Sequence, residues 1–211
     1  MKVLHINASP RQEKSISLEF AQRFLNLLQS KGAVTVDTLN LYSEDLPEFG
    51  ENEVAAKMAL FTGEATTESQ RQAWDRVRSV FDRFAAADLY VINTPMWNNG
   101  VPYKLKQYID LVTQPGWAFG YDPAKGYFGL LENRRAFVVH SAGIHYPGIA
   151  PSFGEDQVQP YLRSWLGLLG LLGLQPSELV CLTSNTEGDQ NTKLQDASWR
   201  KAVQFAASLG S

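Results

Sequence analysis

The chain has 211 residues, of which 44% are hydrophobic, and it carries a formal net charge of -3 at pH 7. This length suits one domain with a sizeable core. The scattered lysines and arginines exclude the basic surface that nucleic-acid or anionic-membrane binding requires. The single cysteine, Cys181, leaves no partner for an intrachain disulfide, and its apolar surroundings in the sequence predict a buried thiol.

Targeting and metal-binding patterns are missing from the sequence. Residues 1–20 do not show the order of a secretory signal, and no window approaches the roughly 18 apolar residues of a membrane span. Three histidines and one cysteine in different predicted elements have no spacing typical of a metal site. We therefore expect a cytoplasmic protein with no resident metal, no nucleic-acid partner and no membrane contact.

Short apolar runs alternate with longer amphipathic stretches along the chain. The apolar runs predict β-strands at 2–7, 34–40, 88–94, 135–141 and 179–184. Helical periodicity follows at about 16–31, 67–86, 101–114, 156–172 and 190–208. Five such units in series predict an α/β fold, a doubly wound five-stranded parallel sheet with helices on both faces, in one domain spanning 1–211.

Two segments interrupt this alternation. Residues 46–68 are long and polar, and they predict a partly helical excursion over the surface. Residues 114–135 combine aromatic side chains with glycines and prolines and show no helical period, so we expect a loop there. Long loops within compact domains are often functional.

The segment NASPRQEKSIS, residues 7–17, lies at the expected ligand-binding edge, since open parallel sheets bind ligands beyond the carboxyl ends of their strands. It contains no glycine, which excludes the dinucleotide and nucleoside-triphosphate loop motifs. Ser9, Arg11, Ser15 and Ser17 offer donors beside a helix N-terminus, a place that binds phosphate readily. A terminal monophosphate, as in a flavin mononucleotide, fits this loop better than a pyrophosphate. The alternative is that Ser15 only caps the helix and the other side chains are solvated.

Met96, Trp97 and Asn98 follow the third predicted strand. An isoalloxazine ring needs an apolar or aromatic wall together with amide groups at its pyrimidine edge, and these residues supply both. The alternative is that Trp97 is an aromatic plug beneath the next helix. The serine-rich loop at the same predicted edge favours the flavin interpretation.

The segment after the fourth strand begins with His140 and the small residues at 141–143, which let a planar ligand approach the backbone closely. We interpret His140 itself as a strand-end residue with a satisfied side chain. His145 and Tyr146 are the titratable pair near this edge. Two roles are open for His145: proton transfer, or a hydrogen bond across the turn. Because no nucleophile or metalloprotease motif is present, any reactive group is expected to come from a cofactor.

Five short motifs, in order, carry a resemblance to a known family. They are S-x-R-x-x-x-S-x-S from Ser9, P-M-W-N at 95–98, G-W-A-F-G-Y at 116–121, G-I-H at 143–145 and P-Y-L-R-S-W-L-G at 160–167. With them the chain resembles the FMN-dependent NADH-azoreductases, within the flavodoxin-like NAD(P)H:quinone oxidoreductases, essentially from end to end.

The resemblance implies a flavodoxin-like fold that holds FMN non-covalently, in a homodimer with its active sites at the subunit interface. It implies ping-pong reduction of quinones and azo compounds, with NADH or NADPH giving hydride through FMN. Where the chain has Trp97, Asn99 and HSAG (140–143), the family commonly has Tyr, Phe and an S-R-G-G-like run.

The resemblance also implies roles for individual residues, matched by position. The residues implied to bind the phosphate side of FMN are Ser9, Ser15, Ile16 and Ser17. The residues implied to line the ring are Met96, Trp97, Asn98 and Asn99. The backbone of His140, Ser141, Ala142 and Gly143 meets the pyrimidine edge and dimethylbenzene region, Phe119 walls the substrate pocket, and His145 and Tyr146 are the candidate catalytic pair.

Two other classes of protein stay open. A flavodoxin-like electron carrier would pass electrons to a protein partner, but such carriers tend to be shorter and strongly acidic around the flavin. The near-balanced charge and the aromatic segment 114–135 favour a small-molecule pocket. An interaction module that keeps the fold without a cofactor is the third class.

Overall fold

A five-stranded parallel sheet runs through the computed structural model, which describes residues 1–146, 148–150, 152, 154–171, 179–183 and 189–209. Its strands are β1 (Lys2–Asn7), β2 (Thr35–Asn40), β3 (Leu89–Pro95), β6 (Arg135–Ala142) and β7 (Leu179–Thr183). Their order is β2-β1-β3-β6-β7, and every neighbouring pair is parallel. The five predicted strands and the doubly wound α/β architecture are confirmed.

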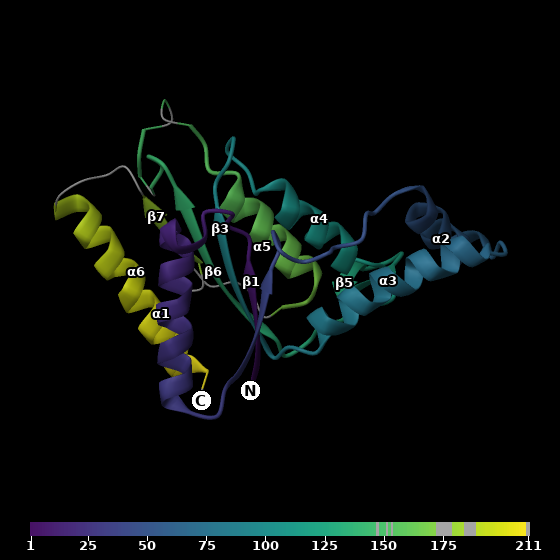
Figure 1. Cartoon of the computed structure of the whole chain (residues 1–211), viewed down its shortest axis with the longest axis horizontal. Coiled ribbons are helices and arrows are strands. Elements are labelled where there is room, and N and C mark those ends of the chain that lie inside the picture. Colours follow the sequence, from purple (N-terminus) through teal and green to yellow (C-terminus); the bar gives the residue numbers. More distant parts are fainter. Residues whose placement is uncertain (147, 151, 153, 172–178, 184–188, 210–211) are drawn as a thin grey trace.

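Helices cover both faces of the sheet (Figure 1). One face carries α1 (Ile16–Lys31) and α6 (Asp189–Ser208), and the other carries α3 (Glu68–Ala85), α4 (Tyr103–Val112) and α5 (Val158–Leu168). All five helices lie where the sequence predicts them, with ends that differ by a few residues. Among the described residues, no helix combines the length and apolar character needed to cross a membrane.

Aromatic side chains fill the space between the sheet and its helices. On the α1 and α6 face, the ring of Phe137 lies 4.2 Å from that of Phe24 and 5.3 Å from that of Phe205. On the opposite face, Phe84 of α3 stacks on Tyr90 of β3 at 4.3 Å. Because both faces are covered, the central strands are apolar almost throughout, which explains why their sequence signal is strong.

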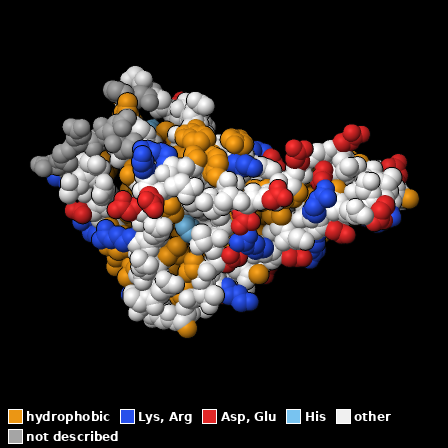
Figure 2. All heavy atoms as spheres, viewed as in Figure 1, with side chains coloured by type: hydrophobic (Ala, Val, Ile, Leu, Met, Phe, Trp, Pro, Cys, Tyr) orange, Lys and Arg blue, Asp and Glu red, His pale blue; other side chains and the backbone are white. Residues whose placement is uncertain are grey.

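The polar excursion at 46–68 contains α2 (Glu51–Thr62), so its partly helical character is confirmed. Helices α2 and α3 form an arm that projects from the sheet, along which acidic and basic side chains are interspersed (Figures 1 and 2). The Thr67 hydroxyl accepts from the amide of Gln70 and starts α3. Toward the sheet, Val77, Phe81 and Phe84 are buried, as their helical spacing predicts.

The expectation of an irregular loop at 114–135 is wrong in part, because the segment forms a β-hairpin. Strands β4 (Phe119–Asp122) and β5 (Gly126–Gly129) pair antiparallel, and the Asp122 carboxylate accepts the amides of Ala124 and Lys125 in the turn. Four-residue strands with a glycine in each are too short for a clear alternating pattern. The hairpin packs tightly on the end of α5: a Cβ at Gly129 would collide with the backbone of Gly170.

Candidate functional site

Three loops meet at the carboxyl edge of the sheet, after β1, β3 and β6. These strands are neighbours, and backbone hydrogen bonds join their ends: the Ala8 amide donates to the Asn93 carbonyl at 2.9 Å, and the Met96 amide donates to the Ser141 carbonyl at 2.7 Å. The chain order reverses between β1 and β3, which is where ligands bind in sheets of this kind. The structure therefore brings together the three segments that the sequence singled out.

The serine-rich loop leads into the N-terminus of α1. The Ser15 hydroxyl accepts from the Leu18 amide at 3.2 Å and lies 3.2 Å from the Ser17 hydroxyl. Ser15 therefore is a helix cap, as the alternative interpretation supposed. Within the described part of the chain, however, the amides of Ile16 and Ser17 have no acceptor, and Ser9, Ser15 and Ser17 are all buried. Capping leaves these donors free to bind an anion.

A tight turn presents Trp97 at the surface. Trp97 and Gly100 exchange two backbone hydrogen bonds of 2.9 Å, and Asn98 and Asn99 between them have positive φ angles of 48° and 65°. Asparagine tolerates this conformation better than most residues, which explains the Asn-Asn-Gly sequence. The side chain of Trp97 is 39% exposed, so it is not a plug beneath α4. Met96 is half-buried against the core.

Tyr42 also belongs to this edge, although its sequence context did not predict this. It follows β2, and its ring lies edge-on to those of Trp97 at 6.4 Å and Tyr103 at 6.2 Å. Burial raises the pKa of the Tyr42 hydroxyl, whose oxygen is buried without a hydrogen-bond partner among the described residues. The sequence signal that could have identified Tyr42 is its position directly after β2, at the carboxyl end of a predicted strand. Figure 2 shows hydrophobic side chains gathered at the surface over the start of α4.

The end of β6 offers backbone and small side chains rather than reactive groups. Ser141 is half-buried, Ala142 is buried and Gly143 is exposed. Ser141 pairs with Pro95 of β3 on one side and Leu182 of β7 on the other, so the backbone at this point is held by two neighbours. A planar ligand reaching this edge would meet Gly143 with no side chain in the way.

The side chain of His140 is fully buried, as a strand-end residue would be. Its Nε2 atom lies 3.1 Å from the side-chain amide nitrogen of Gln159 and 3.5 Å from the Asp156 carboxylate. Burial, opposed by the Asp156 charge, lowers the pKa of His140 to about 4. Its Nδ1 atom has no partner among the described residues, so the expectation of a fully satisfied side chain is wrong for one of the two nitrogens.

His145 and Tyr146 are both half-buried in the segment after β6. The backbone carbonyl of His145 faces the thiol of Cys181 at 3.7 Å, while its side-chain Nδ1 atom is buried without a partner among the described residues. The alternative of a hydrogen bond across the turn therefore finds no support at Nδ1. Burial raises the pKa of Cys181 to about 12, which confirms the expectation of a buried, unreactive thiol.

Phe119 does not lie with the three loops of its own chain. It follows the C-terminus of α4, whereas Trp97 precedes the N-terminus of this ten-residue helix, which is about 15 Å long. Phe119 instead lines an apolar hollow of about 570 Å³. The other lining residues are Lys57, Phe61, Pro115, Gly116, Gly120, Tyr121 and Tyr127.

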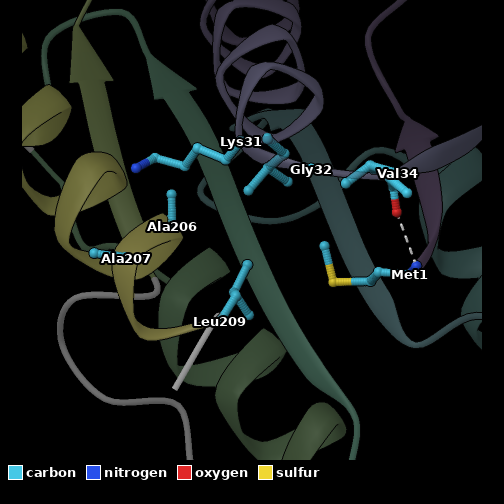
Figure 3. Close-up of a pocket in the computed structure, with 9 residues that line it drawn as sticks. Met1, Lys31, Gly32, Val34, Ala206, Ala207 and Leu209 are labelled. Atoms are coloured by element: carbon cyan, nitrogen blue, oxygen red, sulfur yellow. Dashed lines mark hydrogen bonds between the residues drawn. The ribbon is translucent and has the colours of Figure 1, made fainter.

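A second hollow, of about 400 Å³, lies at the opposite edge of the sheet (Figure 3). Met1, Lys31, Val34 and Leu209 line it, and the N-terminal ammonium donates to the Ala33 carbonyl at 3.0 Å. Its walls are mostly aliphatic, and it has none of the aromatic and amide groups found at the carboxyl edge. Within the described residues, no group of histidine, cysteine and acidic side chains could hold a metal ion.

The strand order, the helix N-terminus after β1 and the loops around it define a flavodoxin-like α/β protein. A family model described as a flavodoxin-like fold matches residues 1–203, and the chain belongs to this family.

Named relatives agree with this assignment. The chain is 44% identical over 185 residues to an FMN-dependent NADH:quinone oxidoreductase of Ruegeria pomeroyi, covering 85% of this chain and 91% of the relative. It is 37% identical over 211 residues to FMN-dependent NADH:quinone oxidoreductase 2 of Burkholderia lata, covering 98% and 99%. The crystal structure of an azoreductase from Bacillus anthracis superposes with a TM-score of 0.84, at 26% identity over 98% of both chains.

The buried His140 predicts an acid-sensitive fold. An unfolded histidine has a pKa near 6.5, and the folded value of about 4 lies below it. The unfolded chain therefore binds the extra proton first, and stability that is complete above pH 6.5 is lost as the pH falls toward 4. The loss from this residue is about 2 kcal/mol at pH 5.

Urea unfolding of the apoprotein at pH 7 and pH 5 measures this loss. We expect His140→Gln to lose distinctly less stability than the wild type between the two pH values, while the control Ser30→Ala, at an exposed serine of α1, follows the wild type. Equal losses of stability in the wild type and in His140→Gln would show that His140 is not the source of the acid sensitivity.

Proposed function

We propose that this chain is an FMN-dependent oxidoreductase that reduces quinones and azo compounds with NADH. The observation that carries the proposal is that the loop at the α1 N-terminus, with its buried serines, and the loop with the exposed Trp97 follow neighbouring strands, at the point where the sheet order reverses. Relatives that cover most of this chain are named FMN-dependent NADH:quinone oxidoreductases, and a structural neighbour is named an azoreductase.

The loop after β1 fits a terminal phosphate. Its donors are the hydroxyls of Ser9, Ser15 and Ser17 and the amides of Ile16 and Ser17, all without charge, at the positive end of α1. Arg11 is exposed nearby and adds a cationic side chain at the rim. Neutral donors and a helix N-terminus suit the phosphate of FMN, and we assign this loop to it.

The isoalloxazine ring fits between the loops after β3 and β6. Met96 and Trp97 offer apolar surface, Asn98 and Asn99 offer amides, and the small residues at 141–143 offer backbone. The backbone of His140 belongs to the same edge, although its side chain is buried against Gln159 and Asp156. Bound FMN supplies the two-electron chemistry that this chain's own side chains lack.

Proton supply is the remaining requirement, since reducing a quinone takes up protons as well as electrons. His145 and Tyr146 are the titratable side chains on the segment leaving β6. The Nδ1 atom of His145, which has no partner among the described residues, supports a role in holding a proton at this edge, and we assign His145 and Tyr146 to this task.

The electron-carrier alternative is not favoured. The named relatives are oxidoreductases that use NADH and quinones, and the similarity covers nearly the whole chain. We further treat residues 1–211 as a single FMN-binding domain, because the cores on both faces share one sheet. A cytoplasmic location follows as part of the proposal, since the reductant is produced there, and cell fractionation tests it.

A homodimer is part of the proposal, because the β4–β5 hairpin with Phe119 lies apart from the three loops of its own chain. Exposed apolar side chains gather on α2 and on the hairpin, beside the 570 Å³ hollow that Phe119 lines. The exposed residues are Val54, Met58, Leu60, Phe61, Tyr121, Tyr127, Phe128 and Leu130. Apolar patches of this kind are typical of protein contacts. A second copy covering this patch would bring Phe119 toward the partner's flavin, as a wall of the substrate pocket.

A reconstitution assay tests the activity. We expect the purified protein to bind FMN and, without oxygen, to turn over NADH catalytically only when FMN and a quinone or azo dye are both present, with one quinone reduced for each NADH. Ser17→Ala removes one buried donor and should weaken FMN binding about three- to tenfold. Ser30→Ala, an exposed serine near the other end of α1, is the matched control. Failure to turn over NADH with a quinone or an azo dye, or a chain that binds no FMN, would refute the function.

Sedimentation equilibrium with NADH:quinone turnover tests the dimer. We expect the wild type to sediment as a dimer and Phe61→Lys to shift toward a monomer with lower turnover, because a charge is placed in the apolar patch. Val203→Lys is the control, since Val203 is an exposed apolar residue on α6, away from the arm. A fully active wild-type monomer would overturn this part of the proposal.

A further inference from the structure

A row of polar side chains crosses the buried interior of the sheet. His5 and Asn7 of β1 and Asn93 of β3 are 2%, 4% and 0% exposed, in strands whose other buried side chains are apolar apart from Thr94. Burying three polar side chains beside one another is costly unless each finds a partner. In this row each of them does.

The hydrogen bonds of the row run in one direction. Nε2 of His5 lies 2.9 Å from Oδ1 of Asn93, and the Asn93 amide nitrogen donates to Oδ1 of Asn7 at 2.9 Å. Because Oδ1 of Asn93 only accepts, the histidine proton is on Nε2. Nδ1 of His5 is then an acceptor, and it faces the Thr38 hydroxyl at 3.4 Å.

The row ends at the serine-rich loop. Oδ1 of Asn7 accepts the backbone amide of Ser9 at 3.1 Å, in addition to the proton from Asn93. The backbone of Asn93 holds the same loop, because its carbonyl accepts the Ala8 amide at 2.9 Å. The rotamers of two asparagines therefore set where the loop begins, and one of these asparagines is held by His5.

We propose that His5 is a positioning residue for the FMN phosphate: it orients Asn93, which orients Asn7, which holds the Ser9 backbone in place for phosphate binding. The proposal rests on the function proposed above and adds a residue within β1, two positions before Asn7, that is not part of the loop itself. Replacing His5 with an apolar residue leaves Oδ1 of Asn93 buried without its donor. Because an unpaired buried acceptor is costly, the side chain of Asn93 is expected to rotate and lose its hydrogen bond to Asn7.

His5 also borders a polar hollow of about 340 Å³ between α1 and β2. Gln22 of α1 lines the same hollow but takes no part in the row of hydrogen bonds. Gln22→Ala is therefore a matched control, because it alters the hollow and leaves the row intact. His5→Gln is the conservative variant, since its side-chain amide can still donate to Asn93.

The test compares FMN with riboflavin, which carries the same ring but no phosphate. Affinities are measured by flavin fluorescence titration of the apoprotein, in the wild type and the three variants. We expect His5→Leu to weaken FMN binding about tenfold and to change riboflavin binding by less than about twofold. His5→Gln should restore most of the FMN affinity, and Gln22→Ala should match the wild type. If His5→Leu yields no folded protein, His5→Val, which suits a β-strand, replaces it.

The outcomes separate the proposals. A wild type that binds no FMN would refute the proposed function. A wild type that binds FMN no better than riboflavin would refute the phosphate site and this inference with it. An unchanged FMN affinity in His5→Leu, an equal loss for both flavins, or a His5→Gln variant as weak as His5→Leu would overturn the positioning role alone.

Discussion

Parallel pairing of three neighbouring strands is the constraint on which the site depends. The β1–β3 and β3–β6 pairs end at the same edge, and two backbone hydrogen bonds beyond the strands, Ala8 to Asn93 and Met96 to Ser141, continue the pairing into the loops. Segments separated by more than forty residues in the sequence are thereby held side by side. Each loop then needs only to supply its own chemistry.

The three loops supply different kinds of binding group. The start of α1 supplies uncharged donors, the Asn98–Asn99 turn supplies an exposed aromatic ring with amides, and the end of β6 supplies open backbone. Buried polar groups behind the edge serve to hold these pieces in place. His140, with its pKa lowered by burial, is bound to the α5 side, and the row from His5 to Asn7 supports the first loop.

Much of this was predictable from the sequence, for physical reasons. Strands buried on both faces give continuous apolar runs, so β1, β3 and β6 and the loops after them were located correctly. The hairpin at 119–129 was missed because short strands with glycine give no period. Tyr42 and the partners of His5 were missed because their roles depend on contacts between strands, which no local pattern records. The separation of Phe119 from Trp97 likewise follows from the length of α4.

Amide hydrogen exchange with and without FMN tests the central claim most directly, because it reads each segment of the chain in one experiment. We expect FMN to slow exchange together in residues 8–17, 96–101 and 141–146. No change is expected around residues 31–34 and 206–209, which surround the hollow at the opposite edge of the sheet. Protection confined to that hollow, or to only one of the three loops, would contradict a flavin site built where β1, β3 and β6 end.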